Sequence, residues 1–247
     1  MCALGDFLVL SASVLRQIAR YLPHHRSENA SKTHPKSSYD KFKTVSYTRA
    51  TRLTRSEYLA GQRSSYFFTG VGLSLQYDTR DFILNPKRGI YFLVREVFYP
   101  HWLSSHDRNI FATTFTFDAF VPVWKGGVLA FDLYGQLNGD DMPWTLREEL
   151  GAGTSRMRGY YAGRYIDNNQ LSAQMELRQH IYGRVGCVAW AGGGTVFPKL
   201  SQLRMKDMLP NYGLGLRVEF KHNVNIRIDY GFGKDTGGFV FQFAEAF

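Results

Sequence analysis

Cysteine, charge and long apolar runs are all scarce in this 247-residue sequence. Two cysteines, Cys2 and Cys187, cannot form a disulfide framework, and no Cys/His spacing is typical of a zinc site. No apolar run approaches the roughly 20 residues that a membrane helix needs, which excludes a helical membrane protein. Charged residues make up 21% of the chain and hydrophobic residues 44%, which excludes a disordered chain.

The formal net charge of +9 lies mostly at the start of the chain, where residues 1–60 hold ten Lys/Arg and four Asp/Glu. We expect this part to be a basic segment and linker that contacts acidic surfaces such as lipid headgroups. The apolar run Met1–Leu15 predicts either a short amphipathic helix ending near Tyr21 or residues upstream of the true start. Because the remaining residues show no basic stripe or nucleic-acid motif, we expect no nucleic-acid partner.

Residues 61–247 are predicted to form a second unit, an all-β domain. Apolar and polar residues alternate strictly from Phe67 onward, which is the period of β-strands. Seven alternating strands are predicted at 67–78, 111–121, 129–137, 171–181, 212–220, 224–232 and 239–247. Less regular strands are predicted at 89–100 and 184–197, and a tenth strand could come only from Lys41–Leu53.

The connections between these strands alternate between short and longer ones. Tight turns at 125–127, 182–184 and 221–223 are separated by predicted loops at 100–108, 139–167, 198–210 and 231–238. Outer-membrane barrels have short periplasmic turns and longer extracellular loops, whereas a soluble sandwich does not sort its loops in this way. Aromatic residues also cluster near strand ends, as the interfaces of a membrane require. They are Tyr77, Phe98, Tyr99, Trp102, Trp124, Tyr182, Phe197, Tyr230 and Phe247. The pattern favours an antiparallel transmembrane β-barrel with about nine or ten strands, and a soluble β-sandwich binding module is the alternative.

Three motifs make this interpretation more specific. They are Gln76-Tyr77-Asp78-Thr79-Arg80-Asp81 before Pro86, the loop segment Gly151–Tyr160, and the aromatic ending Phe239–Phe247 with Phe241, Phe243 and Phe247 on one face. Together with Glu176-Leu177-Arg178 and Gly213–Arg217, they resemble the barrel of the BamA/TamA outer-membrane assembly-factor family, also called the bacterial surface antigen domain. The resemblance covers about residues 66–247.

The resemblance implies that the long loop folds back into the barrel and carries a tip formed by Met157, Arg158, Gly159 and Tyr160. Five predicted strands follow this tip, as the family pattern requires. The tip arginine of the family meets acidic residues on the lumen wall, and alternation places Glu176, with Arg178 beside it, on that wall. A buried guanidinium needs a carboxylate partner. The alternative is that Arg156, Arg158 and Arg164 are solvated on a surface loop.

The sequence departs from the family pattern in two places. Where the family carries a second acid on the next strand, this chain has Gly192, which predicts a weaker hold on the tip. The family barrel has sixteen strands preceded by periplasmic modules, but this chain has room for about nine or ten strands. We therefore expect a fragment, or a short member that closes a smaller barrel or pairs with a second copy.

The resemblance implies a non-catalytic protein of the bacterial outer membrane that assists insertion or translocation of other outer-membrane proteins. The implied partners are outer-membrane lipid, client β-barrel proteins, and other subunits of an assembly machinery or a second copy. A structural or pore-forming barrel without assembly activity is the alternative. No Gly-x-Ser-x-Gly elbow, phosphate loop or metal motif occurs, so no enzyme, cofactor or metal is expected. His180 is expected in a polar lumen network.

Overall fold

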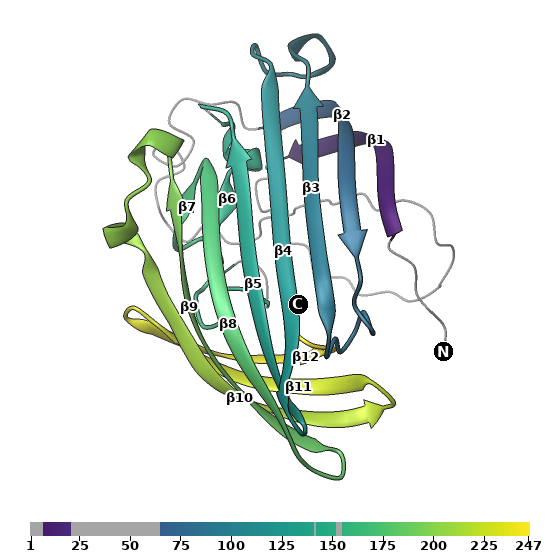
Figure 1. Cartoon of the computed structure of the whole chain (residues 1–247). Helices are drawn as coiled ribbons and strands as arrows, with labels where there is room; N and C mark the ends of the chain where they lie inside the picture. Colours follow the sequence, from purple (N-terminus) through teal and green to yellow (C-terminus); the bar gives the residue numbers. More distant parts are fainter. Residues whose placement is uncertain (1–6, 21–64, 141, 152–154) are drawn as a thin grey trace, which may run out of the picture.

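The computed structural model describes residues 7–20, 65–140, 142–151 and 155–247 (Figure 1). The main strands are β1 Phe7–Arg20, β2 Ser65–Asp78, β3 Gly89–Tyr99, β4 Ile110–Trp124, β5 Gly127–Asn138, β8 Asn169–Tyr182, β9 Val185–Phe197, β10 Leu209–Lys221, β11 Val224–Gly233 and β12 Thr236–Phe243. The minor elements are the short strands β6 Glu148–Glu149 and β7 Ile166–Asp167, and four 3-10 turns at His101–Leu103, Trp144–Leu146, Leu200–Gln202 and Met205–Asp207.

Ten strands form one antiparallel sheet in which neighbours in sequence are neighbours in space. The order is β1-β2-β3-β4-β5-β8-β9-β10-β11-β12, and β6 and β7 make a separate two-stranded ladder. The sheet is strongly curved, so that β10, β11 and β12 run across the lower part of Figure 1, at a steep angle to β3, β4 and β5. Among the described strands, no ladder joins β12 to β1. No helix in the described ranges is long and apolar enough to cross a membrane.

All nine strands predicted between residues 67 and 247 are present, and two other expectations are wrong. Residues 7–20 form strand β1, which pairs with β2 along its whole length, rather than a helix. This strand supplies the tenth place that was expected from Lys41–Leu53, which lies outside the described residues. The last hairpin closes through Lys234 and Asp235 alone, not through a long loop.

The two faces of the sheet differ as the alternation predicted. Apolar side chains of the outer face are exposed, including Leu73 (64%), Leu214 (66%) and Phe241 (55%). The inner face carries buried polar residues from five strands, namely Asp118 on β4, Asp132 on β5, Gln174, Glu176 and Arg178 on β8, Arg217 on β10, and Arg227 and Asp229 on β11. An exposed apolar face around a buried polar interior is the arrangement of a membrane barrel.

The aromatic residues near strand ends do not all face outward. Trp102, Trp124 and Tyr182 are exposed, as an interfacial position requires. Tyr99 and Phe197 are buried instead, so their predicted place in an outer aromatic girdle is wrong. Tyr99 contacts Phe68 edge to face at 5.9 Å and belongs to an apolar cluster inside the barrel.

The connection between β5 and β8 fills much of the interior. Its first part brings Met142 and Trp144 against the apolar inner cluster on β2, β3 and β4. Its later part carries Leu150, Met157 and Tyr160, which form a second buried cluster. Apolar side chains therefore fill one side of the lumen, and the loop tip occupies the other side.

The chain turns inward directly after β12. Ala244 has a positive φ of 69°, Glu245 donates its backbone N–H to Leu84, and Ala246 is buried. Phe247 packs against Phe120 inside the barrel at a ring distance of 6.1 Å. We call residues 244–247 the inward segment. It corrects the prediction that Phe247 shares the outer face with Phe241 and Phe243.

Candidate functional site

The long connection is closed at its neck before it reaches the lumen. Glu148 and Glu149 of β6 pair with Asp167 and Ile166 of β7, and Leu150 donates its N–H to the carbonyl oxygen of Tyr165 at 3.0 Å. The tip Met157–Tyr160 therefore lies in a single loop that this ladder closes at its base. The alternative of a solvated surface loop is wrong for Arg158, which is 1% exposed, and for Arg156, which pairs with Asp132, but Arg164 is exposed as that alternative predicted.

Glycines on the loop and on the wall let the two backbones touch. Gly159 has a φ of +97°, and a Cβ there would overlap the carbonyl of Gly231 on β11. A Cβ on Gly231 would in turn overlap the carbonyl of Arg158. A residue with a side chain would be strained at a positive φ and would push the tip off the wall. The tip therefore docks on β11 by backbone contact.

Arg158 lies between two buried carboxylates. Its Nη2 is 2.6 Å from Oε2 of Glu176 on β8, and its Nη1 is 2.7 Å from Oδ2 of Asp229 on β11. The side chains of all three residues are fully shielded from solvent. A fully buried charge is stable only when it is paired and hydrogen-bonded, and here one guanidinium joins two strands.

The guanidinium of Arg158 also stacks on an aromatic ring. Its Cζ lies 3.5 Å from the centroid of Trp190 on β9, which is a cation–π contact. Trp190 donates its indole N–H to Oδ1 of Asn211 on β10 at 3.0 Å. The amide of Asn211 donates to the backbone oxygen of Arg158. Three successive strands after β8 thus contribute to holding one loop residue.

Tyr160 fixes the end of the tip. Its hydroxyl donates to the carbonyl oxygen of Pro210 at 2.7 Å and accepts the backbone N–H of Lys234 at 2.8 Å. Gly233 leaves the space that the ring occupies. Burial raises the pKa of the Tyr160 hydroxyl, so that the phenol stays protonated and able to donate.

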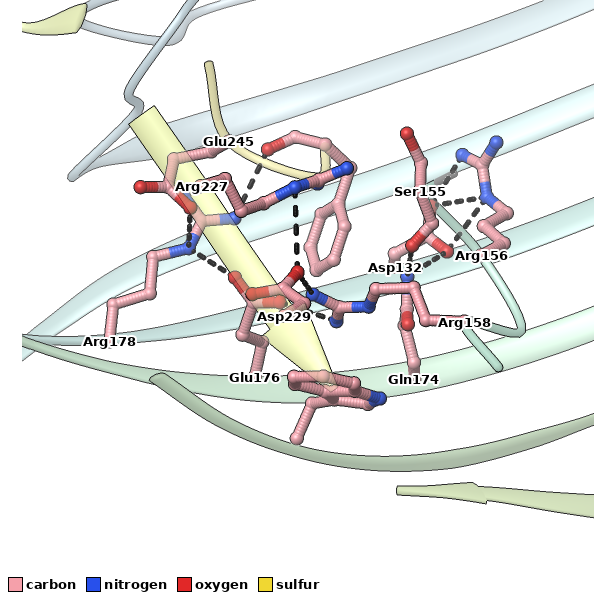
Figure 2. A network of polar contacts seen from close by, with 12 residues as sticks. Asp132, Ser155, Arg156, Arg158, Gln174, Glu176, Arg178, Arg227, Asp229 and Glu245 are labelled. Carbon is pink, nitrogen blue, oxygen red and sulfur yellow. Dashed lines mark hydrogen bonds and ion pairs between the residues drawn. The ribbon is translucent and has the colours of Figure 1, made fainter. Parts of the chain in front are cut away.

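The site continues as a chain of ion pairs toward the inward segment (Figure 2). Arg178 donates to Oε1 of Glu176 at 2.7 Å, and Arg217 pairs with Oδ1 of Asp229 at 2.5 Å. Arg217 also pairs with Glu245 at 2.7 Å. The two carboxylates that hold Arg158 are therefore shared with other arginines through their second oxygens, and Arg227 also lies 3.4 Å from the Asp229 oxygen that binds Arg158. Arg178 and Arg158 do not compete, because they use different oxygens of Glu176.

The structure corrects two expectations about this network. The weaker hold predicted from Gly192 is wrong, because Asp229 on β11 supplies the second acid. Alternation already placed Asp229 on the polar face, but sequence spacing could not show that β11 curves back to within reach of the tip. His180 is exposed and contacts the carbonyl of Gly183 in the β8–β9 turn at 2.9 Å, rather than joining the lumen network.

Other contributors were missed because their role depends on curvature rather than on alternation alone. They are Trp190, Asn211, Arg217 and Glu245. Within the described part of the chain, no group of three or more His, Cys, Asp or Glu side chains could hold a metal ion. Nothing in the geometry of the network selects a cofactor, and its chemistry is that of a structural ion-pair cluster.

The sequence and the fold of this chain are similar to those of known proteins. The model of the Omp85 superfamily domain matches residues 15–247. The chain belongs to the Omp85 superfamily. A search of curated proteins finds no match. Among solved structures, CdiB from Acinetobacter baumannii is similar, with a TM-score of 0.54 over 72% of this chain and 12% sequence identity.

Membership of the Omp85 superfamily identifies the curved sheet as an antiparallel transmembrane β-barrel of the bacterial outer membrane. At 12% identity, the likeness to CdiB shows the fold alone, and this chain spans about a third of the length of that protein (33%). The family and the strand order agree with the resemblance drawn from the sequence motifs, and they extend it toward the N-terminus to include part of β1.

Proposed function

We propose that this Omp85 protein assists the insertion or translocation of other outer-membrane proteins, without catalysis, through the open edges of its sheet. The observation that carries the proposal is the mismatch of these edges. β1 has fourteen residues and β12 has eight, and no ladder joins them among the described residues. An unpaired strand edge presents N–H and C=O groups that pair readily with another chain.

The inward segment adds to this argument. Because the chain leaves the sheet after Phe243, β12 cannot grow to match β1 in length. A client strand could therefore pair with the free edge of β1 or β12 by strand addition. Outer-membrane lipid and a client β-barrel are the partners that this mechanism needs, and a further assembly subunit or a second copy could cover an edge at rest.

The alternative function is a passive pore or structural barrel. The described lumen argues against an open pore, because the Met142–Trp144 stretch and the Arg158 tip both occupy it. Because its own loop fills the lumen, the barrel can act on a client either at the edge of the sheet or after the loop has been displaced from the lumen. On this proposal, six residues of the predicted site keep that loop in place, namely the tip residues Met157, Arg158, Gly159 and Tyr160 and the wall residues Glu176 and Arg178.

The proposal is tested by client folding in lipid vesicles. An unfolded eight-stranded barrel is added to vesicles with and without the purified protein, and the folded fraction is followed by heat-modifiable gel migration. We expect folding at least several-fold faster with the protein. A photo-crosslinking residue in place of Phe241 on β12 should capture the client, whereas the same residue in place of Leu214, equally exposed but mid-sheet, should not. Equal folding rates in both vesicle types, with ion conductance only in the loaded ones, would favour the pore.

A further inference from the structure

A second arginine of the long loop, two residues before the tip arginine, has its own partner on the wall. Arg156 Nε lies 2.8 Å from each carboxylate oxygen of Asp132 on β5, and its Nη2 lies 2.5 Å from Oδ1. Asp132 is fully buried. The guanidinium also lies over the ring of Tyr134, with its Cζ at 4.4 Å from the centroid. A chelated carboxylate and a ring contact make this a built site rather than a chance surface pair.

The two carboxylate sites on the barrel wall have the same spacing as the two arginines of the loop. Asp132 of β5 is the direct partner of Gln174 on β8, and Gln174 donates its side-chain amide to the backbone oxygen of Ser155 at 3.2 Å. Glu176, which holds Arg158, lies two residues further along β8. Two residues of loop therefore match two residues of wall, a distance of about 7 Å in an extended chain.

Because the arginines and their carboxylates have the same spacing, the loop could dock on the wall in a second register. If the loop slid outward by two residues, Arg158 would arrive where Arg156 now lies and could pair with Asp132. The same chemistry, a guanidinium against a buried carboxylate, would then be satisfied at a shallower depth. The slid register would lose the contact of Gly159 with Gly231 and would bring Tyr161 there instead, so it competes with the observed register only when Asp132 has lost Arg156. Figure 2 shows the two arginines reaching different carboxylates, with Arg156 at Asp132 and Arg158 at Asp229 and Glu176.

We propose that Arg156 is a positioning residue that sets the depth of the loop tip, by occupying Asp132 and so denying it to Arg158. A second observation supports this role. Asp118 of β4 is the direct cross-strand partner of Asp132 and is 3% exposed. Two acidic side chains buried side by side cannot both stay ionised without a cation, so the Asp132 carboxylate would attract Arg158 once Arg156 is removed. This inference does not depend on the assembly role, because it concerns where the loop rests.

The experiment measures the depth directly. In a background with Cys2→Ser and Cys187→Ser, spin labels are attached at Trp102→Cys and Tyr161→Cys, both highly exposed in the parent protein, and the distance between them is measured by pulsed electron paramagnetic resonance in vesicles. We expect one distance in the parent protein. Arg156→Gln should add a second population, displaced by about 7 Å. Arg164→Gln, an exposed arginine of the same loop, should leave a single distance.

A double variant separates positioning from simple stabilisation. Arg156→Gln with Asp132→Asn removes both the depth-setting arginine and the carboxylate that competes for Arg158, so the displaced population should largely disappear. If Arg156 only stabilises the loop, both variants should show the same broad distribution. That outcome would overturn the proposal, as would a single unchanged distance in Arg156→Gln. Heat-modifiable migration confirms in each case that the barrel has folded.

Discussion

At the scale of single residues, Arg158 is the most constrained side chain in the described structure. It holds two carboxylates, an indole ring and, through its backbone oxygen, the amide of Asn211. Both carboxylates would keep arginine partners if Arg158 were removed, because Arg178 pairs with Glu176, and Arg217 and Arg227 pair with Asp229. The loss is therefore shared between two partly compensated carboxylates.

We expect Arg158→Ala to lower the free energy of unfolding by about 3 kcal/mol, the lower end of the cost of breaking a buried ion pair. Arg164→Ala, on the exposed part of the same loop, should change it by less than about 0.5 kcal/mol. Urea titration of the refolded protein in vesicles measures both. Similar values for the two variants would show that the tip contributes nothing to stability.

A charge swap of Arg158→Glu with Glu176→Arg would look like a natural rescue from the sequence alone. The structure argues against it, because the new glutamate would face Asp229 and the new arginine would face Arg178. Both replacements would bring like charges together in a shielded site. No recovery is therefore expected in the same titration.

At the scale of elements, alternation predicted β2 to β12 well because each strand has one face in lipid and one in a polar lumen. It failed for β1, whose apolar run Phe7–Leu10 does not alternate. It also failed for the β11–β12 connection, because the glycines on both sides of Lys234 and Asp235 predicted a longer loop. The two strands are joined instead by a two-residue turn, in which Asp235 has a φ of 53°. Contacts such as Arg158 with Asp229 depend on sheet curvature, which no local pattern encodes.

The two faces of β10 and β11 give a prediction of their own. Leu214→Arg places a charge in lipid near mid-strand and should cost about 2–4 kcal/mol. Asn225→Arg should cost less, because Asn225 faces the lumen and donates to Glu245 at 2.7 Å. Gly215, although it also faces the lumen, is no fair control, since any Cβ there would overlap the carboxylate of Asp229. Equal folding yields for both arginine variants in vesicles would contradict the assigned faces.

At the scale of the whole molecule, β1 fixes the side on which the undescribed connection leaves the sheet. Arg20 pairs with Ser65, and Phe67 next to it accepts contacts from Ser105 in the β3–β4 loop. The connection from Arg20 to Ser65 therefore starts and ends at the long-loop end of the barrel. In outer-membrane barrels the longer loops are extracellular.

This orientation predicts labelling from outside the cell. In the cysteine-free background, Trp102→Cys, at an exposed position of the β3–β4 loop, should react with a membrane-impermeant maleimide in intact cells. Lys125→Cys, in the tight β4–β5 turn at the opposite end, should react only after the outer membrane is permeabilised. Labelling of Trp102→Cys only in permeabilised cells would reverse the orientation and would place the longer loops in the periplasm.

The inward segment also bears on the order in which parts of the barrel fold. Its contacts come from distant parts of the chain: Leu84 in the β2–β3 loop, Phe120 on β4, Arg178 on β8 and Arg217 on β10. A partial barrel that lacks β4, β8 or β10 cannot offer all of these partners together. We therefore expect the inward segment to dock late in folding, after these strands have paired.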